Sequence, residues 1–585
     1  MSLLKDFTQM YIVSYNVSMF LPTTKDEIKK AGWEKPDIIL ISGDTYIDSP
    51  FIGSAVIGNW LTAHGFKVAV IAQPDITTDD IARFGEPSLF WGVSAGAMDS
   101  FVSNYTSLNK FRNDDDLTPG GINNRRPDRA SMVYTNIIRK HFKNTKPIVL
   151  GGVEASLRRI THYDFKDNAL RRSILFDAKA DIISYGMGEK SMLELAQNMK
   201  DGKDWRNVKG ICYISKEKPE NEVLEIPSFE ECKDNKDKFF EAFTSFYKNV
   251  CAENEKVLYQ KHSERYLVQN PKQPVLTSKE LDAIYDLDYT REVHPYYAKL
   301  GHVKAQDTIK FSITTHRGCF GECNFCSITV HQGKQVVSRS EESVLNEAKK
   351  ITKLKDFKGY ITDLGGPTAN MNKSCCSAND YAGSCENKRC LFPKICENLI
   401  MGHNKQLDLL NKVAAIEGVK KVFISSGIRY DLICADTVNG QNYLDTLLES
   451  HISGQMKIAP EHTDDKVLNL MGKPNTAILK QFIGMFQNSN DELQITNYES
   501  KDKGRFLTYY FIAAYPGCGE AEMKSLKHFI GRNLKIRPEQ VQIFTPTPST
   551  IATMMYYTER DLKGNKIFIE KDRNNKQRQK RIICG

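Results

Sequence analysis

The sequence lacks several features that would define its class at once. No run of about 18 apolar residues occurs in it, so it predicts no membrane-spanning helix. The first residues, MSLLKDFTQMYIVSYN, carry polar side chains through their apolar stretch and lead to no small-residue cleavage site, which argues against a secretory signal. A repeat with a period of about 20 to 50 residues is also missing. We therefore expect a cytoplasmic protein without a membrane partner.

A large excess of one charge sign is missing too. The 80 basic and 72 acidic residues give a formal charge of +8, which permits a nucleic-acid partner without requiring one. No RNA-binding module is recognisable. A hydrophobic content of 41% excludes wholesale disorder, and 585 residues suit about two to four domains.

The cysteines carry the first sign of chemistry. Eight of the fourteen lie between residues 319 and 396, a clustering that favours metal or cluster binding over disulfides in a chain that is not secreted. Cys319, Cys323 and Cys326 form C-x3-C-x2-C within FSITTHRGCFGECNFCSI. Three thiolates at this spacing can hold three irons of a 4Fe-4S cube and leave the fourth iron open for another ligand. An open iron indicates catalysis rather than electron transfer.

A zinc site is the alternative for this loop. The three cysteines would then be joined by His316 or His331 as the fourth ligand. Structural zinc usually takes two ligand pairs rather than one triplet, which favours the cluster. Gly318 and Gly321 let the backbone wrap closely around a cluster, and Phe325 offers an apolar face beside it.

Apolar runs that alternate with amphipathic stretches predict an α/β protein. In the first part of the chain, continuous apolar runs predict parallel strands covered on both faces, a doubly wound sheet whose strand ends face a ligand crevice. From residue 308 onwards, six further units of strand and helix predict a partial or complete (β/α) barrel. The first set of strands is expected within 37–44, 66–75, 87–96, 146–156 and 180–190.

Composition suggests where these parts meet. A stretch rich in Lys, Glu and Asp predicts a charged helical connection. The composition of the C-terminal end predicts a mobile basic tail or a frayed helix. We expect an N-terminal domain over 1–215, the connection over 216–300, the barrel over 301–570 and the tail over 571–585.

The cysteine loop resembles the radical S-adenosylmethionine (SAM) superfamily, whose signature is this triplet with an aromatic residue, here Phe325, before the third cysteine. The resemblance implies that SAM chelates the open iron through its amino and carboxylate groups. It further implies that one electron cleaves SAM to methionine and a 5′-deoxyadenosyl radical, which abstracts hydrogen from a substrate. An electron donor such as flavodoxin or ferredoxin is implied as a partner.

Two further strand ends fit the same resemblance. In DLGGPTAN, Gly365 and Gly366 take the place of the glycine motif whose backbone contacts the amino group of SAM, although proline replaces its usual acidic third residue. In FISSGIRYD, Ser425, Ser426 and Arg429 suit a ribose hydroxyl and a carboxylate.

Longer segments are similar to one branch of the superfamily, the YgiQ family, which has a long N-terminal domain. The resemblance rests on NYTSLNKFRNDDDLTPGG, GGVEASLRRITHYDF, DLGGPTANM and FISSGIRYDL, and it extends from about residue 37 to about residue 580. It names no substrate. Longer members of the family continue beyond this C-terminus.

A second cysteine group follows the glycine motif. Beyond Cys375, the residues Cys376, Cys385, Cys390 and Cys396 have the spacing C-x8-C-x4-C-x5-C, which is similar to that in the YgiQ family. Four thiolates in one loop suit a structural zinc or a second iron-sulfur cluster near the mouth of the barrel. Free loop cysteines are the alternative.

The N-terminal segment GDTYIDSPFIGSAVIGNWLTAHGFKVAV resembles cobalamin-binding domains, in which D-x-H-x-x-G supplies a histidine to cobalt. Here the frame runs from Asp48 to Gly53, and Pro50 stands at the histidine position. The segment therefore implies either cobalamin held without histidine or an inherited fold that has no cofactor.

Acidic, basic and proton-transferring residues gather in EASLRRITHYD. Glu154 or His162 could move protons and Arg158 could bind a phosphate or carboxylate in a pocket that faces the barrel. A solvated helix with internal ion pairs is the alternative.

Together these features predict a radical SAM enzyme in which a doubly wound, cobalamin-binding-like domain precedes a partial barrel. We keep three alternatives open: a cobalamin-dependent radical methyltransferase, an RNA-modifying enzyme, and a non-catalytic iron-sulfur protein of electron transfer or sensing. The three-cysteine loop argues against the last, because an open iron has little use there.

Overall fold

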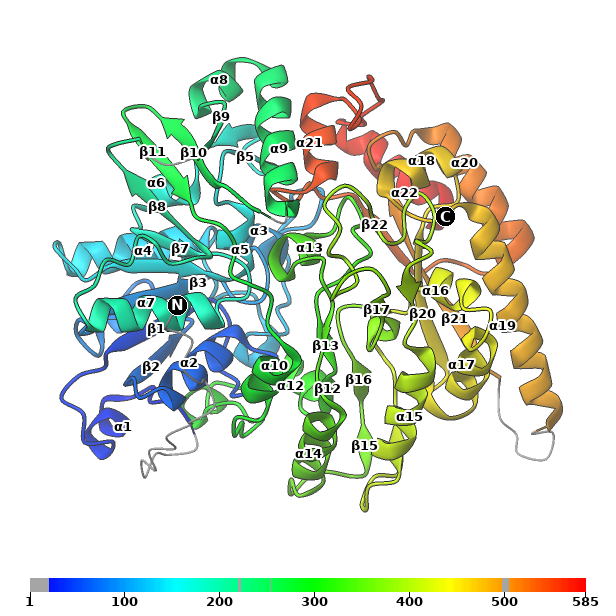
Figure 1. Cartoon of the computed structure of the whole chain (residues 1–585), viewed down its shortest axis with the longest axis horizontal. Helices are drawn as coiled ribbons and strands as arrows, with labels where there is room; N and C mark the ends of the chain where they lie inside the picture. The colour runs from blue at the N-terminus through cyan, green and yellow to red at the C-terminus, as the bar shows by residue number, and fades with distance from the viewer. Residues whose placement is uncertain (1–19, 219–222, 253, 497–503, 585) are drawn as a thin grey trace.

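The computed structural model describes residues 20–218, 223–252, 254–496 and 504–584. Two α/β halves lie side by side, the N-terminal half at the left of Figure 1 and the C-terminal half at the right. The N-terminal residues that we examined for a secretory signal lie outside the described ranges. Within those ranges, no helix is both long enough and apolar enough to cross a bilayer.

The N-terminal half is built on one sheet of nine strands. Successive residues of its first strand enter different cores: Ile38 and Leu40 pack with α2 (Gly53–Ala63) and α7 (Glu189–Lys200), whereas Ile39 and Ile41 pack with α4 (Ala130–His141). Apolar side chains on both faces explain the continuous apolar runs. The doubly wound sheet is confirmed, with parallel strands in the order β2 (Val68–Ala72), β1 (Ile38–Ser42), β3 (Phe90–Ser94), β4 (Ile148–Gly151) and β7 (Ile182–Ser184).

The segment 216–300, which we expected to be a helical connection, contains strands as well as helices. Three of its segments are strands that extend the sheet beyond β8 (Ile211–Ser215), alongside helices such as α8 (Phe229–Asp234), α9 (Lys236–Cys251) and α10 (Ser278–Tyr285). The charged composition concealed short strands whose buried side chains are partly apolar, such as Leu258 and Leu267, and partly polar, such as Gln260. These strands are β9 (Val223–Ile226), β10 (Val257–His262) and β11 (Arg265–Gln269).

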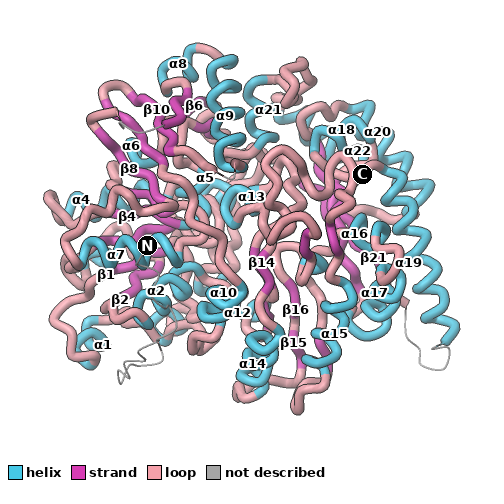
Figure 2. Tube along the Cα trace, viewed as in Figure 1, coloured by secondary structure: helices cyan, strands magenta, loops and turns pink. Residues whose placement is uncertain are grey.

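The C-terminal half is a partial barrel of parallel strands (Figure 2), and each of the six expected stretches contains a strand. The chain pairs β12 with β16, β15 with β19, and β21 with both β20 and β22, and a parallel bridge from Ile428 to Ile458 joins the second and third groups. The strands are β12 (Ser312–Thr314), β15 (Tyr360–Ile361), β16 (Asp363–Gly365), β19 (Lys421–Val422), β20 (Gln455–Glu461), β21 (Phe506–Ala513) and β22 (Gln540–Ile543).

The C-terminal end, expected to be a mobile basic tail or a frayed helix, forms helix α22 (Arg573–Cys584), which packs against α20 (Glu520–Phe529) and β22. Its basic composition hides a buried face made of Lys576, Gln579 and Ile583. The Gln579 side chain accepts a hydrogen bond from the Ala514 backbone at 2.9 Å. This spacing of about one helical turn brings the three residues onto one side of α22.

Candidate active site at the cysteine loop

The cysteine loop begins beyond β12 and β13 (His316–Arg317) and ends at α13 (Ser327–Gln332), for which Cys326 is the N-cap residue. The loop therefore lies at the carboxyl end of the first barrel strand. Gly318 has a φ of +82°, and a Cβ there would lie 1.9 Å from the Gln335 carbonyl oxygen, so only glycine fits. The Cys319 backbone N–H closes the loop on the Gly333 carbonyl at 3.2 Å.

The three thiols share one half-buried site. Burial, together with the neighbouring thiols, raises the pKa of Cys319 and raises that of Cys326 to about 12. Thr368 Oγ1 lies 3.3 Å from the Cys319 sulfur. Clustered thiols in such surroundings resist ionisation unless a metal balances their charge. The donor set therefore fits an iron-sulfur cluster, and Cys319, Cys323 and Cys326 would hold it.

Each histidine of the zinc alternative has one ring nitrogen with a partner elsewhere, while the buried His316 Nε2 atom has none among the described residues. The His316 Nδ1 atom lies 3.0 Å from Thr315 Oγ1, and the His331 Nδ1 atom lies 3.0 Å from Ser156 Oγ. In the described ranges, no three His, Cys, Asp or Glu side chains converge as they would on a single metal ion. The alternative thus gains no support from the geometry.

The strand ends around the loop converge on a carboxylate that sequence reasoning missed. Asp363 Oδ1 accepts hydrogen bonds from the backbone N–H groups of Ser425, at 2.8 Å, and Ser426, at 3.1 Å, and the Ser426 hydroxyl donates to the same carboxylate. A Cβ at Gly365 would lie 2.3 Å from Ser426 Oγ, and one at Gly366 would lie 2.4 Å from the His316 ring. These close approaches explain both glycines. The acid two residues before Gly365 was the available signal.

Arg429 reaches the cysteine site. Its Nε atom donates to Asp431 at 2.8 Å, and its Nη1 atom lies 3.4 Å from the Cys323 sulfur. Burial opposes its charge, but the Asp431 carboxylate and the Cys323 thiol hold the pKa of Arg429 above its ordinary value. Phe325 is half-buried and meets the Tyr515 ring edge-on, with centroids 6.1 Å apart. The guanidinium is thus a fixed cation beside the thiols.

Two further charged residues at this end of the barrel carried no sequence signal. Glu461 ends β20 with a φ of +68°, and burial raises the pKa of its carboxyl group although Lys473 and Arg429 oppose the rise. The buried Lys473 ammonium donates to the Ala459 carbonyl at 2.6 Å. The site therefore contains acids and bases from several strand ends.

A cavity of about 990 Å³ separates the cysteine loop from the N-terminal half. Cys323 and Cys326 line one wall, and Arg159, Tyr185 and Phe246 of the N-terminal half line another. A cavity of this size can enclose a small-molecule substrate next to the thiols.

The second cysteine group opens onto the same cavity through Cys385. The Asn379 side-chain nitrogen lies 3.8 Å from the Cys376 sulfur and 3.4 Å from the Cys385 sulfur. Burial, together with the nearby Cys385 and Cys396 thiols, raises the pKa of Cys390 to about 11. Thiolates are ligands that a metal or a cluster takes, but no three of these cysteines converge on a single ion position in the described ranges.

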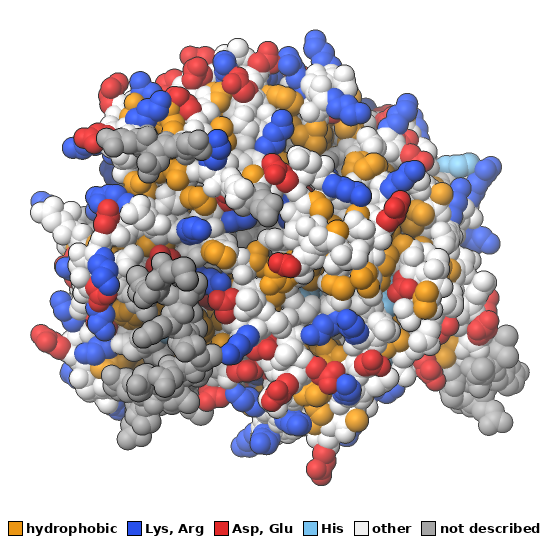
Figure 3. Space-filling model, in the orientation of Figure 1, with side chains coloured by type: hydrophobic (Ala, Val, Ile, Leu, Met, Phe, Trp, Pro, Cys, Tyr) orange, Lys and Arg blue, Asp and Glu red, His pale blue; other side chains and the backbone are white. Residues whose placement is uncertain are grey.

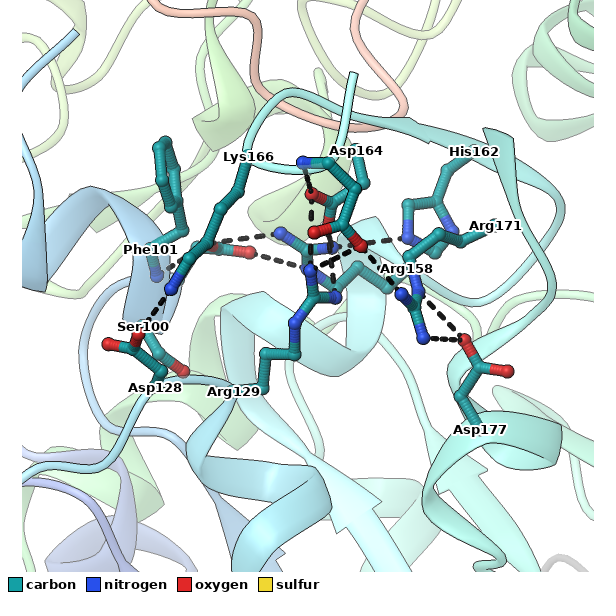
Figure 4. Close-up of polar contacts among 12 residues, drawn as sticks. Ser100, Phe101, Asp128, Arg129, Arg158, His162, Asp164, Lys166, Arg171 and Asp177 are labelled. Atoms are coloured by element: carbon teal, nitrogen blue, oxygen red, sulfur yellow. Dashed lines mark hydrogen bonds and ion pairs between the residues drawn. The ribbon is translucent and has the colours of Figure 1, made fainter. Parts of the chain in front are cut away.

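Glu154, Arg158 and His162 do not line this cavity. Figure 4 shows Arg158 and His162 in a buried polar network inside the N-terminal half. Arg158 forms ion pairs with Asp99 and Asp164, both at 2.7 Å. At these positions the structure has internal ion pairs, as in our alternative interpretation, but they are buried rather than on a solvated helix.

The other two members of this trio also have internal partners. The Glu154 carboxylate accepts from the Ser100 backbone N–H at 2.8 Å and from the Ser100 hydroxyl. His162 Nδ1 bonds the Ile160 carbonyl at 3.0 Å, and burial, together with the Arg158 charge, lowers the pKa of His162 to about 4. The cavity is reached instead by Arg159, the residue next to Arg158.

The cobalamin-like frame has a structural role. Asp48 accepts hydrogen bonds from Asn59 and from the Thr290 backbone, both at 2.8 Å, and Pro50 is buried. At the ends of β1 and β3, a Cβ on Gly43 would lie 2.1 Å from the Ala95 carbonyl oxygen. The frame offers no histidine to cobalt, and the ends of β1 and β3 pack directly against each other. These residues therefore do not fit a histidine-ligated cobalamin.

The fold and the cysteine loop define a radical SAM protein. In agreement, residues 20–312 match the family model described as Radical SAM N-terminal.

The chain belongs to the UPF0313 protein family. It is 54% identical over 567 residues to UPF0313 protein FN0734 of Fusobacterium nucleatum subsp. nucleatum, which covers 96% of this chain and 98% of that protein. It is 46% identical over 564 residues to a UPF0313 protein of Thermotoga maritima, and the alignment covers 94% of this chain and 96% of that protein.

Solved structures similar to this chain include two radical SAM proteins. The methyltransferase TsrM from Kitasatospora setae, with cobalamin and a [4Fe-4S] cluster bound, gives a TM-score of 0.47 at 12% identity, with 92% of this chain and 87% of that chain covered. The cobalamin-dependent SAM radical enzyme OxsB gives 0.48 at 11% identity, with 91% and 57% covered.

Proposed function

We propose that this chain is a radical SAM enzyme of the YgiQ type that takes a hydrogen atom from a substrate bound in the cavity between its halves. The observation that carries the proposal is the position of the triplet: Cys319, Cys323 and Cys326 share one site at the carboxyl end of β12, and two of them line the cavity. When bound, a 4Fe-4S cube with one open iron supplies an electron that breaks the sulfonium bond of SAM, giving methionine and a 5′-deoxyadenosyl radical.

The residues around the triplet would hold SAM. As the family resemblance implies, the backbone at Gly365 and Gly366, at the end of β16, would contact the ammonium group of SAM, while Ser426 and the His316 ring fill the space that side chains there would take. Arg429, fixed by Asp431, is the nearest cation for a carboxylate, and the exposed Ser425 is suited to a ribose hydroxyl. Ser426 would support the site through its bond to Asp363.

The walls of the cavity would protect the radical. Apolar and aromatic groups, including Tyr185 and Phe246, line the cavity opposite Cys323 and would limit the access of water to the radical. The second cysteine group would hold zinc or a second cluster at the rim, next to Cys385. A flavodoxin or ferredoxin is the proposed source of the electron.

The other three functions are less well supported. Cobalamin-dependent methyl transfer lacks a histidine ligand in the frame around Pro50. RNA modification would call for a basic surface, and Figure 3 shows basic and acidic side chains interspersed across the face in view. A non-catalytic iron-sulfur protein would use a fourth thiolate, whereas the loop supplies three.

Cluster loading tests the proposal directly. We expect anaerobically reconstituted protein to bind about four iron and four sulfide ions through the triplet, and its reduced electron paramagnetic resonance (EPR) spectrum to change when SAM is added. Cys319→Ala should lose this response. Cys584→Ala, which alters an exposed cysteine on α22, is the control and should keep it. A SAM-dependent spectrum that survives Cys319→Ala would overturn the proposal.

A further inference from the structure

One wall of the cavity contains a buried cation without a counter-ion. Arg159 is 1% exposed and lines the cavity. Its Nε atom donates to Gln269 Oε1 at 3.0 Å and its Nη1 atom donates to the Ser156 carbonyl, so both acceptors are neutral. No carboxylate in the described part of the chain lies within ion-pairing distance of it. Burying a charge in this way is unfavourable unless a ligand balances it.

Arg159 differs in this respect from every other buried arginine in the described ranges. Each of the other six is paired with a carboxylate. The protein therefore balances its buried guanidinium groups as a rule, and the exception faces the cavity. The paired residues are Arg126, Arg158, Arg291, Arg317, Arg339 and Arg429.

The Arg159 guanidinium is also held in place. It lies 4.7 Å from the centroid of the Tyr185 ring and 4.7 Å from that of the Phe246 ring, and both rings line the cavity. The Tyr185 hydroxyl is in turn fixed by its bond to the Asn270 carbonyl at 2.6 Å. Aromatic faces stabilise a cation without neutralising it. A guanidinium fixed in this way is ready to bind an anion with little loss of side-chain freedom.

The acid that would be the natural partner, Glu255, is kept apart from Arg159. Gln269 lies between them: its Oε1 accepts from Arg159, and its Nε2 donates to Glu255 Oε1 at 3.4 Å. The Glu255 carboxylate is bonded instead to the Lys272 backbone N–H at 2.9 Å. Burial raises the pKa of Glu255, which weakens it further as a counter-ion. The charge of Arg159 therefore remains available to the cavity.

We propose that the cavity binds a substrate with an anionic group, a carboxylate or a phosphate, that pairs with Arg159 while the rest of the molecule extends toward Cys323 and Cys326. Naming this ligand as the substrate rests on the function proposed above, whereas anion binding itself does not. A bidentate ion pair with a guanidinium suits both anions.

Titration with two simple anions tests the proposal. Reconstituted protein is titrated separately with inorganic phosphate and with succinate while its melting temperature is recorded. We expect the melting temperature to rise saturably with at least one anion. The apparent affinity of Arg159→Met for that anion should be weaker by about 10-fold or more, because a charge-assisted pair is lost. The anion that gives the rise distinguishes a phosphate ligand from a carboxylate ligand. Lys209→Met, which removes an exposed lysine from the same cavity, is the matched control and should behave as the wild type.

Equal affinity in Arg159→Met and wild type, or no saturable rise with either anion, would overturn the proposal. If Arg159→Met does not fold, Arg159→Lys takes its place: affinity several-fold weaker than wild type supports the assignment, and unchanged affinity refutes it. Cys319→Ala separates the two proposals, because it should keep anion binding while it loses SAM cleavage. Intact SAM cleavage together with Arg159-independent anion binding would refute this inference alone.

Discussion

At the scale of single residues, the site is organised by buried charges and their partners. Asp363 accepts three hydrogen bonds from Ser425 and Ser426, Arg429 is paired with Asp431, and Arg159 has no acid. A charge that the protein itself satisfies shapes the site, whereas a charge left unsatisfied at a cavity wall selects a ligand. This difference distinguishes Asp363 from Arg159.

The Asp363 carboxylate should therefore be essential for the geometry of the barrel mouth. We expect Asp363→Ala to lower the free energy of unfolding by about 1–3 kcal/mol, because three donors lose their acceptor. The affinity for SAM should fall as well. Urea denaturation and SAM titration measure the two effects. Asp408→Ala, on the exposed face of α15 (His403–Ala414), is the control, and a similar effect there would contradict this role.

Sequence reasoning singled out the cysteine positions, and in the N-terminal half it named Arg158 rather than its neighbour Arg159, which lines the cavity. Arg158 and Arg159 follow α5 (Gly152–Leu157) as adjacent residues, and the structure directs one into an ion-pair network and the other to the cavity. Which of two adjacent arginines faces a ligand depends on acids far away in sequence, such as Asp99. Motif spacing carries no such information.

At the scale of elements, continuous apolar runs and strand-end glycines were enough to predict β1, β2, β3, β4 and β7. The hairpin of β10 and β11 was missed because its short strands mix apolar, polar and charged residues within a charged stretch. The packed helix α22 was expected only as a mobile tail or a frayed helix, for a related reason. Its buried face consists of a lysine, a glutamine and an isoleucine, which only tertiary packing makes visible.

The loop of the second cysteine group gives a prediction at this scale. We expect Cys376→Ser to lower the metal content of the purified protein, measured as iron, sulfide and zinc, because Cys376 belongs to the four-cysteine spacing. Cys375→Ser is the matched control, since the adjacent residue on β17 (Cys375–Cys376) points to the other side of the strand. Unchanged metal in Cys376→Ser would reduce the group to ordinary loop cysteines.

Helix α22 gives a prediction about pH. Burial lowers the pKa of Lys576 to about 8, and its ammonium lies 2.9 Å from the Tyr556 hydroxyl. Between pH 8 and the ordinary lysine value, the unfolded chain binds more protons than the folded chain, so this lysine makes stability rise with pH. The full rise is about 2–3 kcal/mol.

Lys576→Met should remove this contribution. Denaturation from pH 7.5 to about 10.5 should show that the wild type gains stability relative to the variant as pH rises. Taking the difference between the two proteins cancels the titration of tyrosines and cysteines common to both. A constant difference across this range would show that Lys576 is not a destabilising buried charge.

At the scale of the whole molecule, the two halves meet around the cavity. Arg317 of the barrel forms a buried ion pair with Glu189 of the N-terminal half at 2.6 Å, and Ser549 Oγ donates to the Leu157 carbonyl at 2.7 Å. Helix α13, which directly follows the triplet, packs against α5. The site is therefore shared by both halves rather than contained in the barrel.

Replacing either member of the ion pair between the halves should strongly destabilise the protein. We expect Glu189→Leu and Arg317→Met each to lower the free energy of unfolding by about 3–5 kcal/mol, because each leaves a buried charge unpaired. The double variant should be clearly less destabilised than the sum of the two. Additive effects in urea denaturation would show that the two charges do not interact.

The central claim is that the triplet starts radical chemistry in the space between the halves. Its most direct test is to reduce the anaerobically reconstituted protein with dithionite in the presence of SAM and to measure 5′-deoxyadenosine. We expect wild type and Cys584→Ala to form 5′-deoxyadenosine together with methionine, and Cys319→Ala to form neither above background. A wild-type protein with a full cluster complement that forms no more 5′-deoxyadenosine than Cys319→Ala would contradict the account.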